Sequence, residues 1–387
     1  MNQKEYNICF ITAARSEYGL LRYLMEEIRQ TPGLWLQLIV TGGHLLAEQG
    51  HTIDRILADG FQVDARIDAG LDTTSEESIA AAMGRLGEQL AAVFGRLEPD
   101  LLVVLGDRYE LLPVCQTALI MQIPIAHISG GDITEGAIDD AVRNAVSMMA
   151  TWHFPGTEEA AENLRRIRGS ADHIWVVGEP GLDARYRIEP IARDALAADL
   201  GLDPQKKWIL CTYHPVTRGS VENDLRTVDD LIQALLEAGT EYQTLFTYAN
   251  ADFGGAQINR RMGEAAAAHP ERFRQIPSLG QQRYWSFMQE AVLVAGNSSS
   301  GILEAPFVGV PVLNIGDRQK GRYQCGNVVQ CGVTGEEIRE GLSRALALRV
   351  DPSDADHWGD GHTSERIARL LVEQCCGSTP LDKQVKE

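Results

Sequence analysis

Residues 7–30 read NICFITAARSEYGLLRYLMEEIRQ and indicate the class of fold. The apolar run at 7–12 is typical of a buried strand, and residues 17–30 carry the spacing of an amphipathic helix. A second long helical pattern covers residues 75–97. Further apolar runs of strand length occur at 36–41, 101–105, 125–128, 174–177, 208–212, 243–247, 292–295 and 312–315. Strands that alternate with helices in this way predict an α/β protein whose parallel sheets are covered by helices on both faces.

A break at residues 178–183, GEPGLD, divides this pattern into two halves. Gly and Pro are typical of turns, and the alternation of strands and helices restarts beyond them. We therefore predict two doubly wound, Rossmann-like domains, formed by residues 1–180 and 181–375. Residues 364–374 are expected to form a last helix and 376–387 a mobile tail. The cleft between two such domains is the expected ligand site.

The composition excludes several kinds of partner. The 387 residues include 35 Lys and Arg against 54 Asp and Glu, a formal net charge of -19. Such a chain repels nucleic acid and anionic membranes, so we expect neither as a partner. No apolar stretch approaches the roughly 18 residues that span a bilayer, and the start of the sequence lacks a signal-peptide pattern. The seven cysteines show neither C-x-x-C spacing nor the density of a disulfide scaffold, so we expect buried, reduced thiols in a cytoplasmic protein.

The common cofactor motifs are absent from the sequence. The loop after the first strand reads TAARSEYG in place of G-x-G-x-x-G, which disfavours a nicotinamide or flavin enzyme. Neither a G-x-x-x-x-G-K-[ST] phosphate loop nor an H-E-x-x-H pair is present. We therefore expect no cofactor and no metal, and we expect any anionic ligand to be captured by positive charge gathered locally.

Charged residues follow two strands of the first half. Arg15 comes just after the first strand, beside Glu17 at a helix start, which is a natural place to hold a phosphate. A surface salt bridge between Arg15 and Glu17 explains the same pattern equally well. In VVLGDRYE, residues 103–110, an apolar strand ends in Asp107 and Arg108. We favour a site role for both over the alternative, in which Asp107 caps a helix and Arg108 is a solvated charge.

The stretch HISGGDITEGAIDDAVRN, residues 127–144, is the richest in candidate site residues. Gly130 and Gly131 allow close backbone approach just after a strand. Four acidic residues follow, namely Asp132, Glu135, Asp139 and Asp140. On the predicted helix, Asp139 and Arg143 are four residues apart and share one face. Acids that offset a helix dipole and a surface ion pair are the structural alternative, but we favour a site here.

In the second half, polar residues stand at the corresponding strand ends. His214 in TYHPVT directly follows a strand, where histidine can donate to a phosphate or act as an acid near neutral pH. A purely structural role for His214 fits the sequence equally well. Asn250 follows the next strand.

The strongest phosphate signal is AGNSSSGILEAP, residues 295–306. A strand ends, the chain turns and a helix begins, so hydroxyl and backbone N–H groups converge at the positive end of a helix dipole. The candidates here are Ser298, Ser299, Ser300 and Gly301. Glu304 has the carboxylate to bind ribose hydroxyls, and Arg318 and Arg322 supply positive charge. The alternative is a serine N-cap with ordinary helix packing.

These motifs follow one another as TAARSEYGLL, VVLGDRYE, AHISGGDITEGAIDDAVRN, VVGEPGLD, TYHPVT, GNSSSGILEAPFVGVPVLNIGDRQ and GRYQCGNV. Together they resemble the hydrolysing UDP-N-acetylglucosamine 2-epimerase family, most closely its sialic and legionaminic acid branch, over residues 7–375. The resemblance implies the GT-B fold, with the active site in the cleft between a sugar-side first domain and a UDP-side second domain. It also implies no metal or nicotinamide cofactor, and a homodimer or homotetramer.

The resemblance implies roles for individual residues. The residues matched to catalytic roles are Asp107, Asp132, Asp139 and His214. The residues matched to substrate contacts are Arg15, Arg108, Arg143, Asn250, Ser298, Ser299, Ser300, Gly301, Glu304 and Arg318. By this match Arg15 meets the diphosphate, His214 the phosphates or the leaving oxygen, and Glu304 the ribose.

Two positions depart from the family pattern. Ser129 stands where many relatives carry a catalytic glutamate, and a serine cannot act as the same base. Either Asp132 takes over this role, or it falls to Asp107 and Asp139. Leu20 stands where some relatives carry a lysine, so that contact does not transfer to this chain.

The reaction implied by the resemblance has two stages. UDP leaves C1 of the sugar as the C2 proton is removed, and water then adds to the glucal-like intermediate while C2 is reprotonated from the opposite face. The substrate is UDP-N-acetylglucosamine or a UDP-2,4-diacetamido-2,4,6-trideoxyglucose, and the product is the free 2-epimeric, mannosamine-type sugar for nonulosonic acid biosynthesis. The alternatives are a GT-B glycosyltransferase with a UDP-sugar donor and a non-catalytic nucleotide-sugar sensor.

Overall fold

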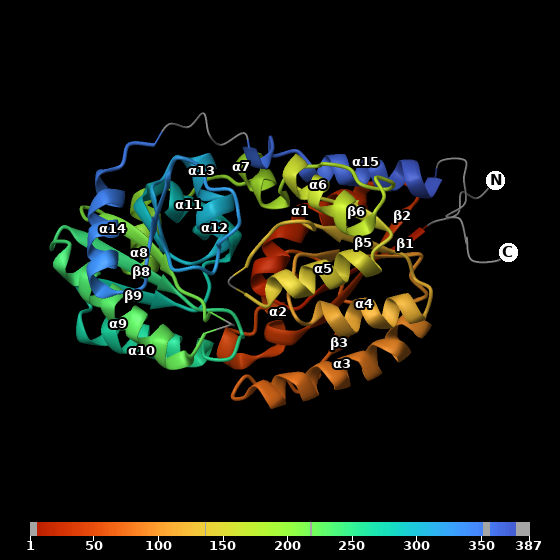
Figure 1. Cartoon of the computed structure of the whole chain (residues 1–387), viewed down its shortest axis with the longest axis horizontal. Helices are drawn as coiled ribbons and strands as arrows, with labels where there is room; N and C mark the ends of the chain where they lie inside the picture. The colour runs from red at the N-terminus through yellow and green to blue at the C-terminus, as the bar shows by residue number, and fades with distance from the viewer. Residues whose placement is uncertain (1–5, 136, 217–218, 351–356, 377–387) are drawn as a thin grey trace.

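The computed structural model describes residues 6–135, 137–216, 219–350 and 357–376, which form two α/β domains side by side (Figure 1). The first domain is built on a six-stranded parallel sheet with the strand order β3-β2-β1-β4-β5-β6. Its strands are β1 (Tyr6–Thr12), β2 (Leu34–Thr41), β3 (Ala65–Ile67), β4 (Leu101–Leu105), β5 (Ile125–Ile128) and β6 (Trp152–Phe154).

Helices cover both faces of this sheet. One face packs against α1 (Arg15–Gln30) and α2 (Ile53–Ala58), and the other against α3 (Glu76–Leu97), α4 (Leu111–Ile120) and α5 (Asp139–Met149). The remaining elements are the short 3-10 helices η1 (Gly42–Leu45) and η2 (Ala47–Gln49), and α6 (Glu158–Arg168) after β6. On α1, the residues Leu21, Leu24 and Ile28 recur at helical spacing and are fully buried, as an amphipathic helix requires.

The second domain repeats the architecture with the strand order β12-β11-β10-β7-β8-β9, again parallel. Its strands are β7 (Lys207–Thr212), β8 (Tyr242–Thr247), β9 (Phe273–Ile276), β10 (Ala291–Gly296), β11 (Val312–Ile315) and β12 (Val328–Cys331). Its helices are α8 (Arg193–Leu200), α9 (Val221–Glu237), α10 (Gly255–Ala268), α11 (Gly280–Glu290), α12 (Ser299–Leu303), α13 (Ala305–Val308) and α14 (Gly335–Ala347).

In both sheets the strand order reverses at the same point, between β1 and β4 in the first and between β7 and β10 in the second. The loops that leave the carboxyl ends of neighbouring strands diverge there, which opens a crevice for a ligand. The two-domain, doubly wound fold predicted from the sequence is therefore the fold of this chain.

The chain crosses between the domains twice. The first crossing runs through η3 (Pro180–Asp183) and α7 (Ala184–Arg187), and the second leads into α15 (Thr363–Cys376). This last helix packs against α1, and its residues Ile367 and Leu371 join the core of the first domain. The expected range 181–375 for the second domain therefore includes a helix that lies in the first. The expected tail, residues 376–387, lies outside the described residues apart from position 376, where α15 ends.

The sequence overlooked some short strands and predicted one that does not form. Strands β3, β6, β9 and β12, each of three or four residues, are not among the predicted strands. The run at 174–177 is no strand, because it makes a single parallel bridge, from Ile174 to His153. Its neighbour β6 ends at Phe154 and is followed by a proline, which has no N–H to extend a ladder.

Two further sequence expectations concern the cysteines and membrane-spanning helices. The cysteines at positions 9, 115, 211, 325, 331 and 375 are buried, in agreement with the prediction. In the part of the chain that the structure describes, no helix has both the length and the apolar character needed to cross a membrane.

Candidate active site

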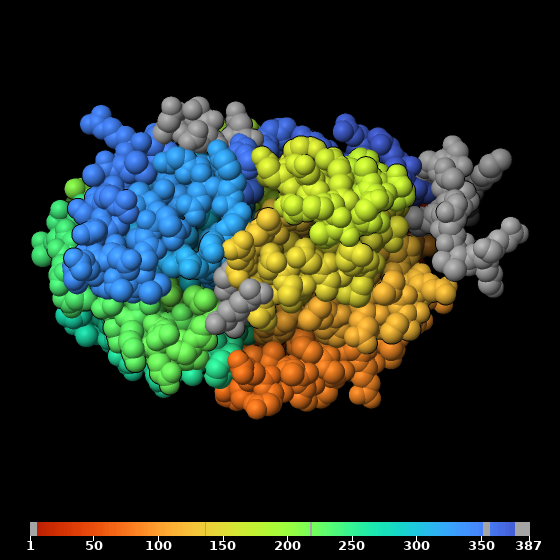
Figure 2. Space-filling view, in the orientation of Figure 1, coloured from red at the N-terminus to blue at the C-terminus, as the bar shows by residue number. Residues whose placement is uncertain are grey.

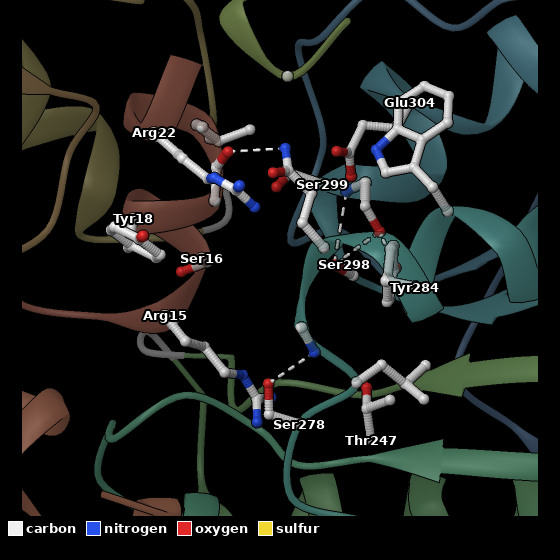
Figure 3. A pocket seen from close by; sticks show the side chains of 18 of the residues that line it. Arg15, Ser16, Tyr18, Arg22, Thr247, Ser278, Tyr284, Ser298, Ser299 and Glu304 are labelled. Carbon is white, nitrogen blue, oxygen red and sulfur yellow. Dashed lines mark hydrogen bonds between the residues drawn. The ribbon is translucent and has the colours of Figure 1, made fainter. Parts of the chain in front are cut away.

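A cavity lies between the domains, at the carboxyl ends of β7 and β8. One wall is formed by the start of α1, and the opposite wall by α11 and the start of α12 (Figure 3). Figure 2 shows the two domains abutting along the junction beside it, where the loop before α5 meets the second domain. There the backbone N of Glu135 donates to the carbonyl of Lys320 (3.0 Å), a normal hydrogen-bond length. The Glu135 carboxylate also lies 3.0 Å from Nζ of Lys320.

Arg15 reaches across the cleft from the first turn of α1. The Glu17 carboxylate accepts hydrogen bonds from the backbone N of Ala13 (2.7 Å) and of Ala14 (3.0 Å), so it caps the helix and does not pair with Arg15. Instead, Nη2 of Arg15 donates to the carbonyl of Tyr248 in the second domain, and its buried Nη1 has no partner among the described residues. Burial lowers the pKa of Arg15 to about 10, but the guanidinium stays charged at neutral pH. A buried cationic N–H without a partner is suited to bind an anion.

The serines at the start of α12 form the facing wall, as Figure 3 shows. Ser298 caps α12 by accepting from the backbone N of Ser300, and the Ser300 hydroxyl also contacts the hydroxyl of Tyr284. Ser299 lines the cavity beside them. Gly301 does not line it, because it is buried against β11, where an added Cβ would lie 2.9 Å from Val312 Cγ1. The sequence alternatives are thus both realised: Ser298 is an N-cap and also faces the cavity.

Glu304 closes the same wall at the end of α12. Burial raises the pKa of its carboxyl group to about 8. An added Cβ on Gly181 of η3 would lie 3.2 Å from a Glu304 carboxylate oxygen and 2.7 Å from Leu20, so the junction segment presses against both. Leu20, the position without the family lysine, gives this part of the cavity an apolar surface.

His214 and Asn250 stand at the ends of β7 and β8 and both line the cavity. The Nδ1 of His214 accepts a hydrogen bond from the backbone N of Asn250 (3.1 Å), so the proton of the neutral ring is on Nε2. Burial and the charges of Arg318 and Arg15 hold the pKa of His214 well below its ordinary value. The ring is therefore a neutral hydrogen-bond donor at physiological pH, and not a charged acid.

A group of ion pairs, the carboxylate cluster, adjoins the cavity. It joins the carboxyl ends of β4 and β5 and the start of α5 to the loop after β11. Its members are Asp107, Asp132, Asp139, Arg143, Arg318 and Arg322. None of these residues lines the cavity itself in the described structure.

Arg143 is the centre of the carboxylate cluster and is fully buried. Its Nη2 contacts the Asp107 carboxylate, and its Nη1 donates to the carbonyl of Asp132 (2.9 Å) and to Thr134 Oγ1 (3.0 Å). Asp107 thus does not cap α4, which begins only at residue 111. The surface pair of Asp139 with Arg143, the structural alternative in the sequence, does not form, because the Asp139 carboxylate lies 3.5 Å from the guanidinium of Arg318 in the second domain.

The neighbours of the carboxylates move their pKa values in opposite directions. Burial opposes ionisation of Asp107, but the guanidinium groups of Arg143 and Arg322 outweigh it and lower its pKa. The pKa of Asp139 is raised by burial and by the negative charge of Asp107. Environments that separate the pKa values of adjacent carboxylates are typical of acid and base pairs.

Arg108 takes up a different position from the one expected. It pairs with Glu110 at 3.0 Å and with Asp252 of the second domain at 3.1 Å, and it does not line the cavity. Both ends of its guanidinium are therefore occupied by carboxylates. This arrangement ties the two domains together and leaves little for a substrate to contact.

The sequence analysis missed several residues that line the cavity, among them Thr247, Tyr284 and Glu179. Tyr284 lies within a helix whose sequence carries no motif. Glu179 belongs to the GEPGLD break, where Gly and Pro indicated only a turn. In the described ranges, no group of three His, Cys, Asp or Glu residues is arranged to hold a metal ion.

The two Rossmann-like domains with a cavity between their strand ends define a protein of the GT-B class. A structure from Neisseria meningitidis, a UDP-GlcNAc 2-epimerase bound to UDP-GlcNAc, has the same fold, with a TM-score of 0.78 at 18% identity over 95% of this chain and 100% of that one. The sequence profile described as UDP-N-acetylglucosamine 2-epimerase matches residues 26–372. The chain belongs to this family.

Its curated relatives include hydrolysing enzymes. The UDP-N,N'-diacetylbacillosamine 2-epimerase (hydrolyzing) of Legionella pneumophila is 34% identical over 98% of this chain and 97% of the relative. The GDP/UDP-N,N'-diacetylbacillosamine 2-epimerase (hydrolyzing) of Campylobacter jejuni is 35% identical over 83% of each. The prediction of a hydrolysing 2-epimerase is confirmed at the level of the family.

Proposed function

We propose that this enzyme hydrolyses a UDP-linked 2-acetamido sugar and inverts its C2 centre, giving UDP and the free 2-epimeric sugar. Arg15 carries the proposal, because its charged Nη1 is buried between the domains without a partner. The hydroxyls of Ser298 and Ser299 face it across the cavity (Figure 3). A diphosphate between these groups would receive donors from both domains at once.

The leaving group develops negative charge as the C1–O bond breaks, and donors fixed in advance stabilise such charge most effectively. Arg15 and the serine hydroxyls supply these donors at the diphosphate. Nε2 of neutral His214 adds a further donor at the bottom of the cavity. Glu304, on the same wall, has the carboxyl group to receive ribose hydroxyls.

Inversion at C2 needs one group that removes a proton and another that returns one to the opposite face. We assign this chemistry to the carboxylate cluster, in which Asp107 follows β4, Asp132 follows β5 and Asp139 begins α5. The raised pKa of Asp139 suits it to take up a proton, whereas the lowered pKa of Asp107 keeps that carboxylate charged. A rearrangement of these segments on substrate binding would bring the cluster to the sugar.

For the substrate we favour UDP-N,N'-diacetylbacillosamine, a UDP-2,4-diacetamido-2,4,6-trideoxyglucose, over UDP-N-acetylglucosamine. Both hydrolysing relatives described above are named for it. The product then belongs to nonulosonic acid biosynthesis of the legionaminic or sialic acid type.

We also propose that the protein is a cytoplasmic homodimer or homotetramer. Light scattering coupled to size-exclusion chromatography tests the oligomeric state.

The test is incubation of the purified chain with each UDP-sugar in deuterated water, followed by NMR. We expect free UDP, one deuteron at C2 and a mannosamine-type configuration, formed faster from the diacetamido sugar. Release of UDP only when an acceptor is added would identify a glycosyltransferase instead. Binding of the UDP-sugar without release would identify a sensor.

A further inference from the structure

Glu179 is a buried carboxyl group at the junction of the domains, and it has no part in the roles proposed so far. It directly precedes η3, is 4% exposed and lines the cavity. Its backbone N donates to the carbonyl of Trp358 (2.9 Å), and its carbonyl accepts from Thr363 Oγ1 (3.3 Å). The main chain is thus held from both sides, which fixes where the side chain points.

The carboxyl group itself meets few polar partners. Its Oε2 accepts a hydrogen bond from the Ser129 hydroxyl (2.9 Å), while its buried Oε1 has no partner among the described residues. An added Cβ on Gly156 would lie 1.9 Å from Oε1, so a glycine is needed there to leave room for the carboxyl group. Ser129 itself has a positive φ of 56°, a conformation that costs a non-glycine residue about 1–2 kcal/mol. The site is therefore built around this carboxyl group.

The surrounding charges leave no cation for Glu179. In the carboxylate cluster, each of the three arginines is matched by one aspartate: Arg143 by Asp107, Arg318 by Asp139 and Arg322 by Asp132. Asp140 is a further acid 3.8 Å from Arg143. The Asp132 carboxylate acts on Glu179 as a neighbouring negative charge. A buried carboxyl group beside a cluster in which acids already match or outnumber the arginines is most stable when it carries a proton.

We propose that Glu179 is a further catalytic residue, which holds a proton beside the charged Asp132 and delivers it to C2 in the second stage of the reaction. The inference rests on the proposed function. In the first stage a cluster carboxylate takes the C2 proton, the C1–C2 double bond forms, and the C1–O bond breaks with its electron pair leaving on UDP. In the second stage the Glu179 O–H bond breaks as the new C2–H bond forms. Water bonds to C1 and its proton returns to the Glu179 carboxylate.

The proton affinity of Glu179 agrees with this role. Burial raises its pKa to about 7, and the charge of Asp132 contributes to the rise. The Ser129 hydroxyl and the charges of Arg322 and Arg143 act in the opposite direction. A group with this pKa is present in both forms near neutral pH, which is the optimum for general acid catalysis. Asp107, by contrast, cannot hold a proton at this pH because its pKa is lowered.

The test compares Glu179→Gln and Glu179→Asp with the wild-type enzyme. Glutamine fills the same space without a transferable proton, so we expect kcat to fall by about 10²–10⁴ while UDP affinity stays within about threefold. Because the first stage survives, UDP is released and the unsaturated glucal intermediate accumulates, visible by NMR. Aspartate restores part of the rate and the pH dependence near neutrality. As a matched control, Glu365→Gln removes an exposed glutamate at the same junction and leaves both readouts unchanged.

Wild-type turnover in Glu179→Gln, or an equal loss of UDP release and of hydration without glucal, would overturn the proposal. A titration of δ-¹³C-labelled glutamate tests it separately from activity. We expect one carboxyl signal with a midpoint about 7 that is missing in Glu179→Gln and shifts upward in Ser129→Ala. A midpoint at the ordinary value would refute the proton-holding role. A wild-type enzyme that releases no UDP, together with the expected titration, would refute the proposed function and not the proton on Glu179.

Discussion

Replacing Arg15 with methionine gives the most direct test of the anion site. Methionine keeps much of the length of the side chain but removes the charge and the unpaired Nη1. A hydrogen bond to a charged group contributes about 1.5–3 kcal/mol, which corresponds to roughly 10- to 150-fold in the dissociation constant. We therefore expect the Kd for UDP to rise by this factor, measured by isothermal titration calorimetry. The bond from Arg15 to Tyr248 is lost as well, which adds to the effect by loosening the closed arrangement of the domains.

The matched control is Arg22→Met, which removes a second arginine from the same cavity. Arg22 already has carboxylate partners, Glu26 at 3.0 Å and Asp59 at 3.6 Å. Its loss should change UDP affinity by less than about threefold, since the guanidinium is already paired with these two carboxylates. Wild-type affinity in Arg15→Met, or a larger loss in Arg22→Met, would refute the assignment of the diphosphate to Arg15.

Four further outcomes follow from the structure. Asp139→Asn should abolish turnover while UDP binding persists, as calorimetry and UDP release will show. Asp107→Asn removes the carboxylate nearest to the buried Arg143 and leaves Asp140 at 3.8 Å, which costs about 3–5 kcal/mol and lowers the melting temperature by roughly 6–20 °C. Gly131→Ala forces a φ of 88° on alanine, which costs about 1–2 kcal/mol, and places its Cβ 2.1 Å from a carbonyl oxygen of α6. The free energy of unfolding, measured with urea, should therefore fall by more than this backbone cost. Burial raises the pKa of Glu304 from its ordinary value of 4.5 to about 8, so its contribution to stability is complete below about pH 4.5 and is lost progressively as the pH rises to about 8. Glu304→Gln should therefore reduce the decline in melting temperature between about pH 5 and pH 8.

Each of these outcomes has a contrary result. Asp199→Asn breaks an exposed pair with Arg283 and should shift the melting temperature little, so a similar shift for Asp107→Asn would contradict the buried-charge argument. Wild-type turnover in Asp139→Asn would exclude that carboxylate from the chemistry. An unchanged unfolding free energy in Gly131→Ala, or an unchanged pH dependence in Glu304→Gln, would contradict the local geometry or the raised pKa.

The sequence predicted the parts of the site that follow strand ends. In parallel sheets the carboxyl ends of the strands share one edge, so residues just after a strand lie near those after its neighbours. Arg15, His214 and Asn250 satisfy this rule and line one cavity. The repeated strand pattern likewise predicted two doubly wound domains.

Contacts between the domains could not be predicted in this way. Arg108 pairs with Asp252, 144 residues away, and the two side chains meet only because the domains face each other at one particular angle. Asp139 finds Arg318 rather than its helical neighbour for the same reason. The sequence also could not predict which domain α15 packs against. An apolar stripe on a helix shows that one face is buried but not which domain buries it.

The double crossing of the chain has a consequence for how the cleft can open. The carboxylate of Asp183 in η3 accepts from the backbone N of Thr363 (2.8 Å) and of Ser364 (2.7 Å), so the two crossings are joined side by side. This paired connection restricts motion between the domains to a hinge rotation about it. A fragment that stops at residue 180 would also leave bare the groove on α1 that α15 fills, so the first domain needs the far end of the chain to complete its own interior.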